Sequence, residues 1–226
     1  LKVKGSQVTA VWDRRPETPS ELLVHSTSEI DKHNINEASG FLTFLRYYIK
    51  DIFSIGSIVF DRVAASKMLQ IKLAKEIGFS LPFTCFSNRK NDIIKFASEF
   101  ENVLLKSIEN DSVWDENEGL EYVFYAKKVK SAELFNLPDE AFSQTVSFVQ
   151  NYIEKKFELR ITIVRDKIFA SKIESQGLDE DNGKIDWRQG YEHGIKFEPF
   201  NLPEDISNKC LMYLRKMGLN FGCFDF

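Results

Sequence analysis

The chain has 226 residues, which suits one compact unit or two lobes, and its hydrophobic content of 43% is enough for a core. The formal net charge of -4 argues against a nucleic-acid-binding protein, and no apolar run approaches the roughly 18 residues of a membrane-spanning helix. Three scattered cysteines without metal-ligand spacing, and the lack of a signal peptide, favour free thiols in a cytoplasmic protein.

The first 60 residues contain a strand and a helix in the sequence pattern. Residues 7–12 alternate between apolar and polar and predict a strand, with residues 13–16 as its polar exit. Residues 20–40 are polar and have no clear period. Residues 41–53 have helical spacing, and Gly56 ends that segment.

Residues 61–107 alternate between helices and strands. Residues 61–77 predict one amphipathic helix with Gly78 as its stop. A short strand at residues 83–86 and a helix from Ser87 or Asn88 to about residue 100 follow. Residues 102–106 predict a buried strand that ends in a lysine.

The rest of the chain is mainly strands. Residues 109–119 are acidic and predict a loop, and strands are expected at 122–126, 145–152, 158–164, 167–173 and 219–225. The pair 158–164 and 167–173 predicts a hairpin that turns at Arg165-Asp166. Residues 178–184 predict an acidic loop, and a helix from residue 201 should stop at Gly218. The pattern is α+β in two lobes.

Charged side chains stand on several of these apolar strands. Glu158 and Arg160 share one face of their strand, because successive side chains alternate. Unpaired burial of such groups is costly, so the pair indicates a wet cleft or, equally, an exposed face with a salt bridge. Lys106 at a strand end is suited to a phosphate or to snorkelling into solvent.

Two further carboxylates attract attention. Asp186 stands two residues before Arg188 in a segment that is either a functional loop or a solvated loop with an interface Trp187. Asp225 ends an apolar strand, where a carboxylate usually has a partner or a metal. The sequence has no Walker A or GxGxxG loop, so a nucleotide site would be of another kind.

Six segments together resemble one superfamily. They are VWDRRP at 11–16, SKMLQIKLAKEIGFSLPFT at 66–84, NVLLKS at 102–107, VQNYIEKKFELRITIVRDKIFASKIESQ at 149–176, DWR at 186–188 and LRKMGLNFGCFDF at 214–226. In this order they resemble ATP-grasp enzymes. The VWDRRP, IESQ and DWR elements are similar to the peptide maturases that make graspetides, the microviridin-type and "grasp-with-spasm" ligases.

The resemblance implies a fold and a set of roles. The expected fold has two α+β lobes around a nucleotide cleft. Residues 1–60 would be the remnant of an N-terminal pre-ATP-grasp lobe, residues 61–148 the central lid lobe, and residues 149–226 an incomplete C-terminal lobe. Both chain ends are expected to be truncated, since the sequence begins at Leu1 and ends in an uncapped apolar run.

The implied ligands are ATP and Mg²⁺. By position, Lys67 and Lys106 match phosphate-contacting lysines, and Arg160 and Arg188 match arginines that act on the reacting phosphoryl and carboxylate groups. The remaining implied residues are the adenine-reading hinge Gln150, Asn151, Tyr152 and Ile153, the ribose ligand Glu154 or Glu158, and the first metal ligand Asp225. The loop after Lys106 departs from the family because it is acidic rather than glycine-rich, and the other two metal ligands expected in the family would lie beyond Phe226.

The implied activity is a ligase that activates a carboxylate with ATP through an acyl phosphate. In the maturase branch this joins side chains of a ribosomal precursor peptide, recognised with its leader, by an ester or amide bond. Two alternatives stay open: an ATP-grasp ligase that adds free amino acids, and a degenerate module that binds nucleotide or peptide without catalysis. The resemblance also leaves open that the protein forms a homodimer. It implies no binding to nucleic acid or to a membrane.

Overall fold

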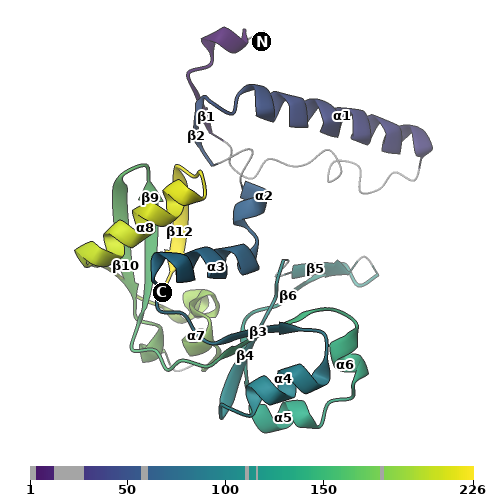
Figure 1. Ribbon diagram of the computed structural model, residues 1–226, viewed down its shortest axis with the longest axis vertical. Helices are drawn as coiled ribbons and strands as arrows, with labels where there is room; N and C mark the ends of the chain where they lie inside the picture. Colours follow the sequence, from purple (N-terminus) through teal and green to yellow (C-terminus); the bar gives the residue numbers. More distant parts are fainter. Residues whose placement is uncertain (1–3, 13–27, 57–60, 110–111, 116, 179–180) are drawn as a thin grey trace.

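The computed structural model describes residues 4–12, 28–56, 61–109, 112–115, 117–178 and 181–226 (Figure 1). The polar exit expected at residues 13–16 lies outside these residues. Within them, no helix is long and apolar enough to cross a membrane.

The N-terminal segment is a small parallel pair of strands with one long helix between them in the sequence. Strand β1 (Ala10–Trp12) pairs in parallel with β2 (Phe53–Ile55). It forms only the second half of the strand expected at 7–12, because a 3₁₀ turn at Gly5–Gln7 includes the first of these residues. Helix α1 (Glu29–Tyr48) projects away from the rest of the chain (Figure 1).

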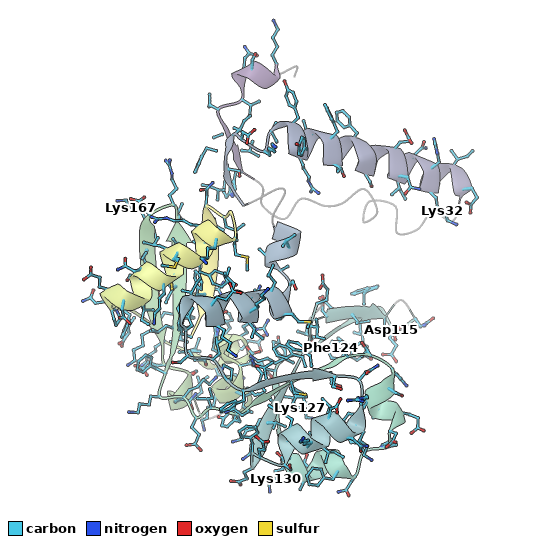
Figure 2. All side chains as sticks on the ribbon, viewed as in Figure 1. Lys32, Asp115, Phe124, Lys127, Lys130 and Lys167 are labelled. Carbon is cyan, nitrogen blue, oxygen red and sulfur yellow. The ribbon has the colours of Figure 1, made fainter. Side chains whose placement is uncertain are left out.

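Helix α1 corrects the expectation for this region at both ends. It begins at Glu29 within the patternless stretch, and it ends at Tyr48, so Phe53 lies in a strand rather than in the helix. Acidic Glu29 and Asp31 in the first turn favour the helix start through the helix dipole. No residue of α1 is buried, and its side chains extend into solvent along its length (Figure 2), which is why no apolar stripe marked its first half.

The single helix expected at 61–77 is two helices. Helix α2 (Asp61–Ala64) is followed by α3 (Lys67–Ile77), because Ser66 has extended backbone angles of φ −63° and ψ 108°. The predicted stop is confirmed: Gly78 is left-handed at φ 91°, and its N–H bonds back to Ala74 O at 3.1 Å.

The first lobe is an antiparallel sheet with helices on one face. The sheet order is β3-β8-β4-β7, and the face opposite the helices includes Lys106 and Gln150. The strands and helices are β3 (Thr84–Ser87), β4 (Asn102–Lys106), β7 (Lys127–Lys130), β8 (Ser147–Asn151), α4 (Lys90–Ala97), α5 (Ser131–Phe135) and α6 (Glu140–Ser143). The helices and the sheet share one core, made of Ile93, Ala97, Val103, Val129, Leu134, Phe142 and Val149.

A two-stranded hairpin replaces the loop expected at 109–119. Strands β5 (Ser112–Asp115) and β6 (Leu120–Val123) pair with each other alone, and they protrude from the first lobe (Figures 1 and 2). The turn is built by Asp115, whose Oδ1 accepts from the backbone N–H groups of Asn117 (2.8 Å) and Glu118 (3.2 Å). The acidic residues that suggested a loop therefore form the turn of a hairpin.

The second lobe is also an antiparallel sheet covered on one face. Its order is β11-β10-β9-β12, formed by β11 (Phe197–Pro199), β10 (Lys167–Ile173), β9 (Glu158–Val164) and β12 (Phe221–Asp225). Helix α8 (Glu204–Lys216) packs Cys210 and Leu214 against Ile161 and Ile163 of β9. The hairpin turn at Arg165-Asp166 is confirmed, with Arg165 left-handed at φ 57°.

Close packing of α8 on the sheet depends on one glycine. A Cβ added at Gly222 of β12 would lie 2.7 Å from Leu214 Cδ2, so the buried Leu214 side chain would have to shift. Between β10 and β11 the chain forms a 3₁₀ turn at Ser175–Gly177, helix α7 (Asp181–Ile185) and a longer 3₁₀ segment, η4 (Trp187–His193). The loop expected at 178–184 is therefore partly helical.

Candidate functional site

The connection from β8 to β9 joins the two lobes, and its first residues are held to the first lobe. Gln150 is 5% exposed and donates from Nε2 to Thr84 Oγ1 at 3.0 Å. Asn151 Oδ1 accepts from Phe83 N at 2.7 Å. Ile153 is 50% exposed, and its backbone has no hydrogen bond to any other described residue. The resemblance implies an adenine-reading hinge at residues 150–153; the first three are hydrogen-bonded to the first lobe, and Ile153 is not.

Three other cations and one buried carboxylate lie near Lys106 and act on its charge. Lys106 ends β4, and the charges of Lys67, Lys155 and Arg188 act on it together with that of Asp186. Lys106 keeps an exposed surface but stands deep between the lobes, so desolvation lowers the pKa of its ammonium; the other cations lower it further and Asp186 opposes them. Such a concentration of positive charge suits an anion with several negative charges.

Asp186 fixes the orientation of Arg188. Its Oδ1 and Oδ2 accept from Arg188 Nε at 2.9 Å and Nη2 at 2.7 Å, a bidentate pair. Oδ1 also accepts from Arg188 N at 3.2 Å and so begins η4. Burial of Asp186 opposes its ionisation, but the hydrogen bonds and charge of Arg188 outweigh burial and lower the pKa of the carboxyl group. The Arg188 guanidinium also lies 5.5 Å from the ring centre of Tyr125, next to the hairpin β5–β6.

The second arginine has a different partner from the one expected from sequence. Arg160 Nη1 donates to both carboxylate oxygens of Asp225 at 2.8 Å, across the paired strands β9 and β12. Burial opposes the charge of Arg160, but the hydrogen bond and charge of Asp225 prevail and raise its pKa. Its guanidinium lies 5.9 Å from the ring centre of Trp187, directly before Arg188. The neighbouring η4 therefore brings both arginines to one region.

Glu158, expected beside Arg160, pairs with Lys155 instead, with Oε1 and Nζ 3.0 Å apart. This contact lacks hydrogen-bond direction, so the buried Oε1 has no hydrogen-bond partner in the described protein. Lys155 Nζ donates to Ile185 O at 2.8 Å. Sequence analysis missed Lys155, because it stands in a charged turn that looks like any solvated segment.

Asp225 is the residue that the resemblance implies as a metal ligand. Within the described ranges, no three His, Cys, Asp or Glu side chains are grouped to hold a metal ion. Asp225, with its side chain 51% exposed, is the carboxylate that stands with Arg160 at this end of the sheet.

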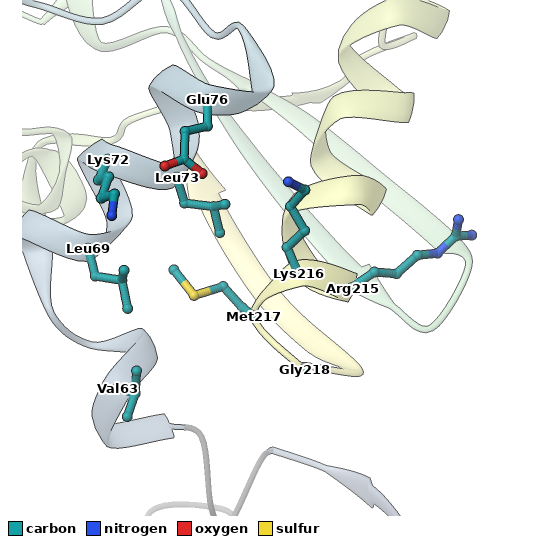
Figure 3. A pocket seen from close by; sticks show the side chains of 9 residues that line it. All are labelled: Val63, Leu69, Lys72, Leu73, Glu76, Arg215, Lys216, Met217 and Gly218. Carbon is teal, nitrogen blue, oxygen red and sulfur yellow. The ribbon is translucent and has the colours of Figure 1, made fainter.

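A hollow lies away from these residues. It has a volume of about 420 Å³ and lies between helices α2 and α3 and the C-terminal end of α8 (Figure 3). Its apolar lining comes from Val63, Leu69, Leu73 and Met217. None of the expected site residues lines it. The charges of the site act on Lys106 instead, so we place the chemistry there.

Comparisons with known proteins agree with this architecture. No family model and no curated protein matches the chain. Among solved structures, it is similar to a Chryseobacterium gregarium RiPP-associated ATP-grasp ligase in complex with ADP and a leader and core peptide, with 28% identity, TM-score 0.80, and coverage of 96% of this chain and 64% of that one. It is also similar to the macrocyclase MdnC of Microcystis aeruginosa MRC bound with the precursor peptide MdnA, with 29% identity, TM-score 0.77, and coverage of 97% and 66%.

A more distant likeness shows the fold alone. The D-alanine–D-alanine ligase of Bacillus anthracis matches with 15% identity and TM-score 0.53, over 81% of this chain and 58% of that one. The chain spans about two thirds of the length of the first two ligases. It has the α+β ATP-grasp fold, and the resemblance to peptide-modifying ATP-grasp ligases seen in the sequence is confirmed.

Proposed function

Because the chain has the fold of RiPP-associated ATP-grasp ligases, we propose that it is the core of an ATP-dependent carboxylate ligase acting on a ribosomal precursor peptide. The product is a side-chain ester or amide, formed through an acyl phosphate. The observation that carries the proposal is the convergence of Lys67, Lys106, Lys155 and Arg188 between the lobes. We also propose the division into residues 1–60, 61–148 and 149–226, and a cytoplasmic location that fits three free cysteines.

The residues present fit Mg-ATP. The four cations suit its phosphates, and the backbone of Ile153, which bonds to no other described residue, is left for adenine. Glu158 Oε1 is buried without a hydrogen bond, and a ribose hydroxyl would supply the missing donor. This favours Glu158 over Glu154 as the ribose ligand. The side chain of Gln150 is already bonded to Thr84, so we assign its part in the hinge to its backbone.

Bound Mg-ATP would supply the phosphoryl group that turns a poorly electrophilic carboxylate into a reactive mixed anhydride. Lys67 and Lys106 hold the phosphate charge, and Asp225 offers one oxygen ligand to magnesium. Arg160 and Arg188 direct guanidinium donors, already oriented by Asp225 and Asp186, at the oxygens on which charge develops. The two lobes keep water from the anhydride until a hydroxyl or amine attacks it.

Mass spectrometry of products tests the function. The protein is incubated with Mg-ATP, free amino acids and a candidate Thr- and Glu-rich precursor peptide. Loss of one water for each bond formed is the expected result. A gain of mass equal to an added amino acid would favour the free-amino-acid ligase, and nucleotide binding without any mass change would favour the non-catalytic module. The homodimer is likewise a proposal, which light scattering of the purified protein tests.

Lys106→Ala should weaken ADP binding by about 1–3 kcal/mol, the range for hydrogen bonds to charged groups. Because burial lowers the pKa of Lys106, the affinity of the unmodified protein should fall as pH rises through that lowered value, and the variant should lose this dependence. Calorimetry across a pH series measures both effects. Lys95→Ala, on the exposed outer helix α4, is the matched control. Equal affinity in Lys106→Ala and the control would contradict the assignment.

A further inference from the structure

One face of the second sheet lies opposite helix α8. Ile161 and Ile163 of β9 point towards α8 and belong to the core. Since side chains alternate along a strand, Arg160 and Thr162 lie on the opposite face. That face contains the arginine of the proposed site and continues beyond it.

The strand register divides the open face into cross-strand rows. Arg160 pairs with Ser171 on β10 and Asp225 on β12, which makes the charged row already described. The next row consists of Phe169, Thr162 and Cys223, in which Phe169 and Cys223 each pair with Thr162. We call these three residues the acceptor row.

The acceptor row is open and uncharged. Phe169 is 61% exposed, and Cys223 is an exposed free thiol. Thr162 Oγ1 and Cys223 Sγ are 3.5 Å apart, so these two side chains share the face. An exposed phenyl ring with a hydroxyl and a thiol beside it is suited to an uncharged stretch of peptide.

The order of residues along β9 gives the row its place in the reaction. Every second residue points to the open face, and two residues advance the strand by roughly 7 Å. In the proposed function Glu158 faces the ribose and Arg160 faces the reacting phosphoryl group. Thr162 is the next side chain in the same direction, where the group that receives the phosphoryl must lie.

Protein contacts bound the acceptor row at both ends. At the charged end the Trp187 ring lies 5.9 Å from the Arg160 guanidinium. At the other end the N-terminal segment meets the sheet: Asn220 Nδ2 donates to Ser54 O at 3.2 Å, and the Arg165 guanidinium lies 4.6 Å from the ring centre of Phe53. The row is therefore a short segment of open sheet between the cations and β2.

We propose that Phe169, Thr162 and Cys223 bind the peptide residue whose carboxylate is activated, together with an uncharged neighbour that packs on Phe169. The inference rests on the proposed function and adds the surface that selects the substrate. The continuity of the row with Arg160 and Asp225 identifies the occupant, since an extended peptide whose carboxylate reaches Arg160 lies across the next row. A second acidic residue beside the activated one would find no cation in this row.

The thiol of Cys223 provides a direct test in the unmodified protein. Burial raises the pKa of Cys210 to about 11 and also raises the pKa of the partly buried Cys85, so iodoacetamide should label Cys223 first. Peptide mapping then measures how fast each cysteine is labelled. The protein is labelled once in the presence of ADP alone and once with ADP and the precursor peptide from which it removes water. We expect protection of at least about tenfold from the peptide and none from ADP. Equal labelling with and without the peptide, or slow labelling of the free protein, would overturn the proposal.

A size-matched pair of variants separates binding from folding. Cys223→Trp should raise the KM for the peptide by about tenfold or more, a loss expected when a bulky ring occupies a binding surface, and leave ADP affinity within about twofold. Met212→Trp, on the exposed side of α8 across the same sheet, should change neither. Retained ADP affinity shows that the variant is folded. Normal peptide KM in Cys223→Trp refutes the acceptor row, whereas failure of the unmodified protein to modify any peptide refutes the proposed function itself.

Discussion

Replacing Arg160 with lysine is expected to lower kcat for peptide modification by about 10²-fold or more, the usual cost of removing one donor that stabilises developing charge. Asp225 holds the guanidinium by two contacts of 2.8 Å, and Trp187 stacks near it, so its donors are fixed before the substrate arrives. A lysine keeps the charge but loses the planar fork. Since the interaction strengthens in the transition state, ADP affinity should stay within about twofold.

Steady-state kinetics with the modified peptide, together with ADP calorimetry, measure these two quantities. Arg215→Lys is the matched control, because Arg215 is exposed at the C-terminal end of α8 and outside the site. A variant with normal kcat, or one whose loss lies wholly in ADP affinity, would remove Arg160 from the chemical step.

Arg188→Lys should produce a loss in kcat of the same order, about 10²-fold. Asp186 receives the Arg188 side chain in a bidentate pair at 2.9 and 2.7 Å, and a single ammonium cannot reproduce both contacts. The variant also leaves the buried carboxylate of Asp186 with fewer hydrogen bonds, so a modest loss of stability should accompany the kinetic defect.

Thermal unfolding distinguishes the two effects of Arg188→Lys. Activity assayed well below the melting temperature reports on catalysis, and the shift in that temperature reports on the loop. If the variant modifies its peptide at the normal rate, the segment Asp186–Arg188 only anchors η4 to the first lobe, which was the alternative interpretation of this motif.

The sequence predicted the elements whose signals are local. Gly78 ended its helix as expected, because a left-handed residue is needed there, and the turn at Arg165-Asp166 lies between two clearly alternating strands. Helix α1 was half missed, because none of its residues is buried and periodicity depends on burial. The hairpin β5–β6 was missed because its turn depends on side-chain acceptance by Asp115, which composition alone does not distinguish from a loop.

The pairing of Arg188 with Asp186 was expected from the sequence, whereas the pairing of Arg160 was not. Arg160 was assigned to Glu158, two residues away, while its partner Asp225 is 65 positions distant and is brought near only by strand pairing. Lys155 was missed for a related reason: its place among the cations depends on how the hinge meets the segment at Ile185. Single-sequence patterns report short-range periodicity, whereas these contacts depend on tertiary arrangement.

The hinge residues held to the first lobe limit where the two lobes can rotate. Asn151 accepts a hydrogen bond from the backbone of Phe83 in the first lobe. Phe157 packs on the second lobe, with its ring centre 5.9 Å from that of Phe200 and 5.0 Å from Lys172 Nζ.

The lobes are also joined by residues 80–83, since Phe79 packs on Phe226 of the second lobe before the chain enters β3. Rotation of one lobe against the other is therefore taken up by the torsion angles of both connections, and its axis lies close to the segment proposed to hold adenine. A base bound close to the rotation axis moves little when the lobes rotate. The phosphates lie farther from the axis, where the distance between the lobes changes most.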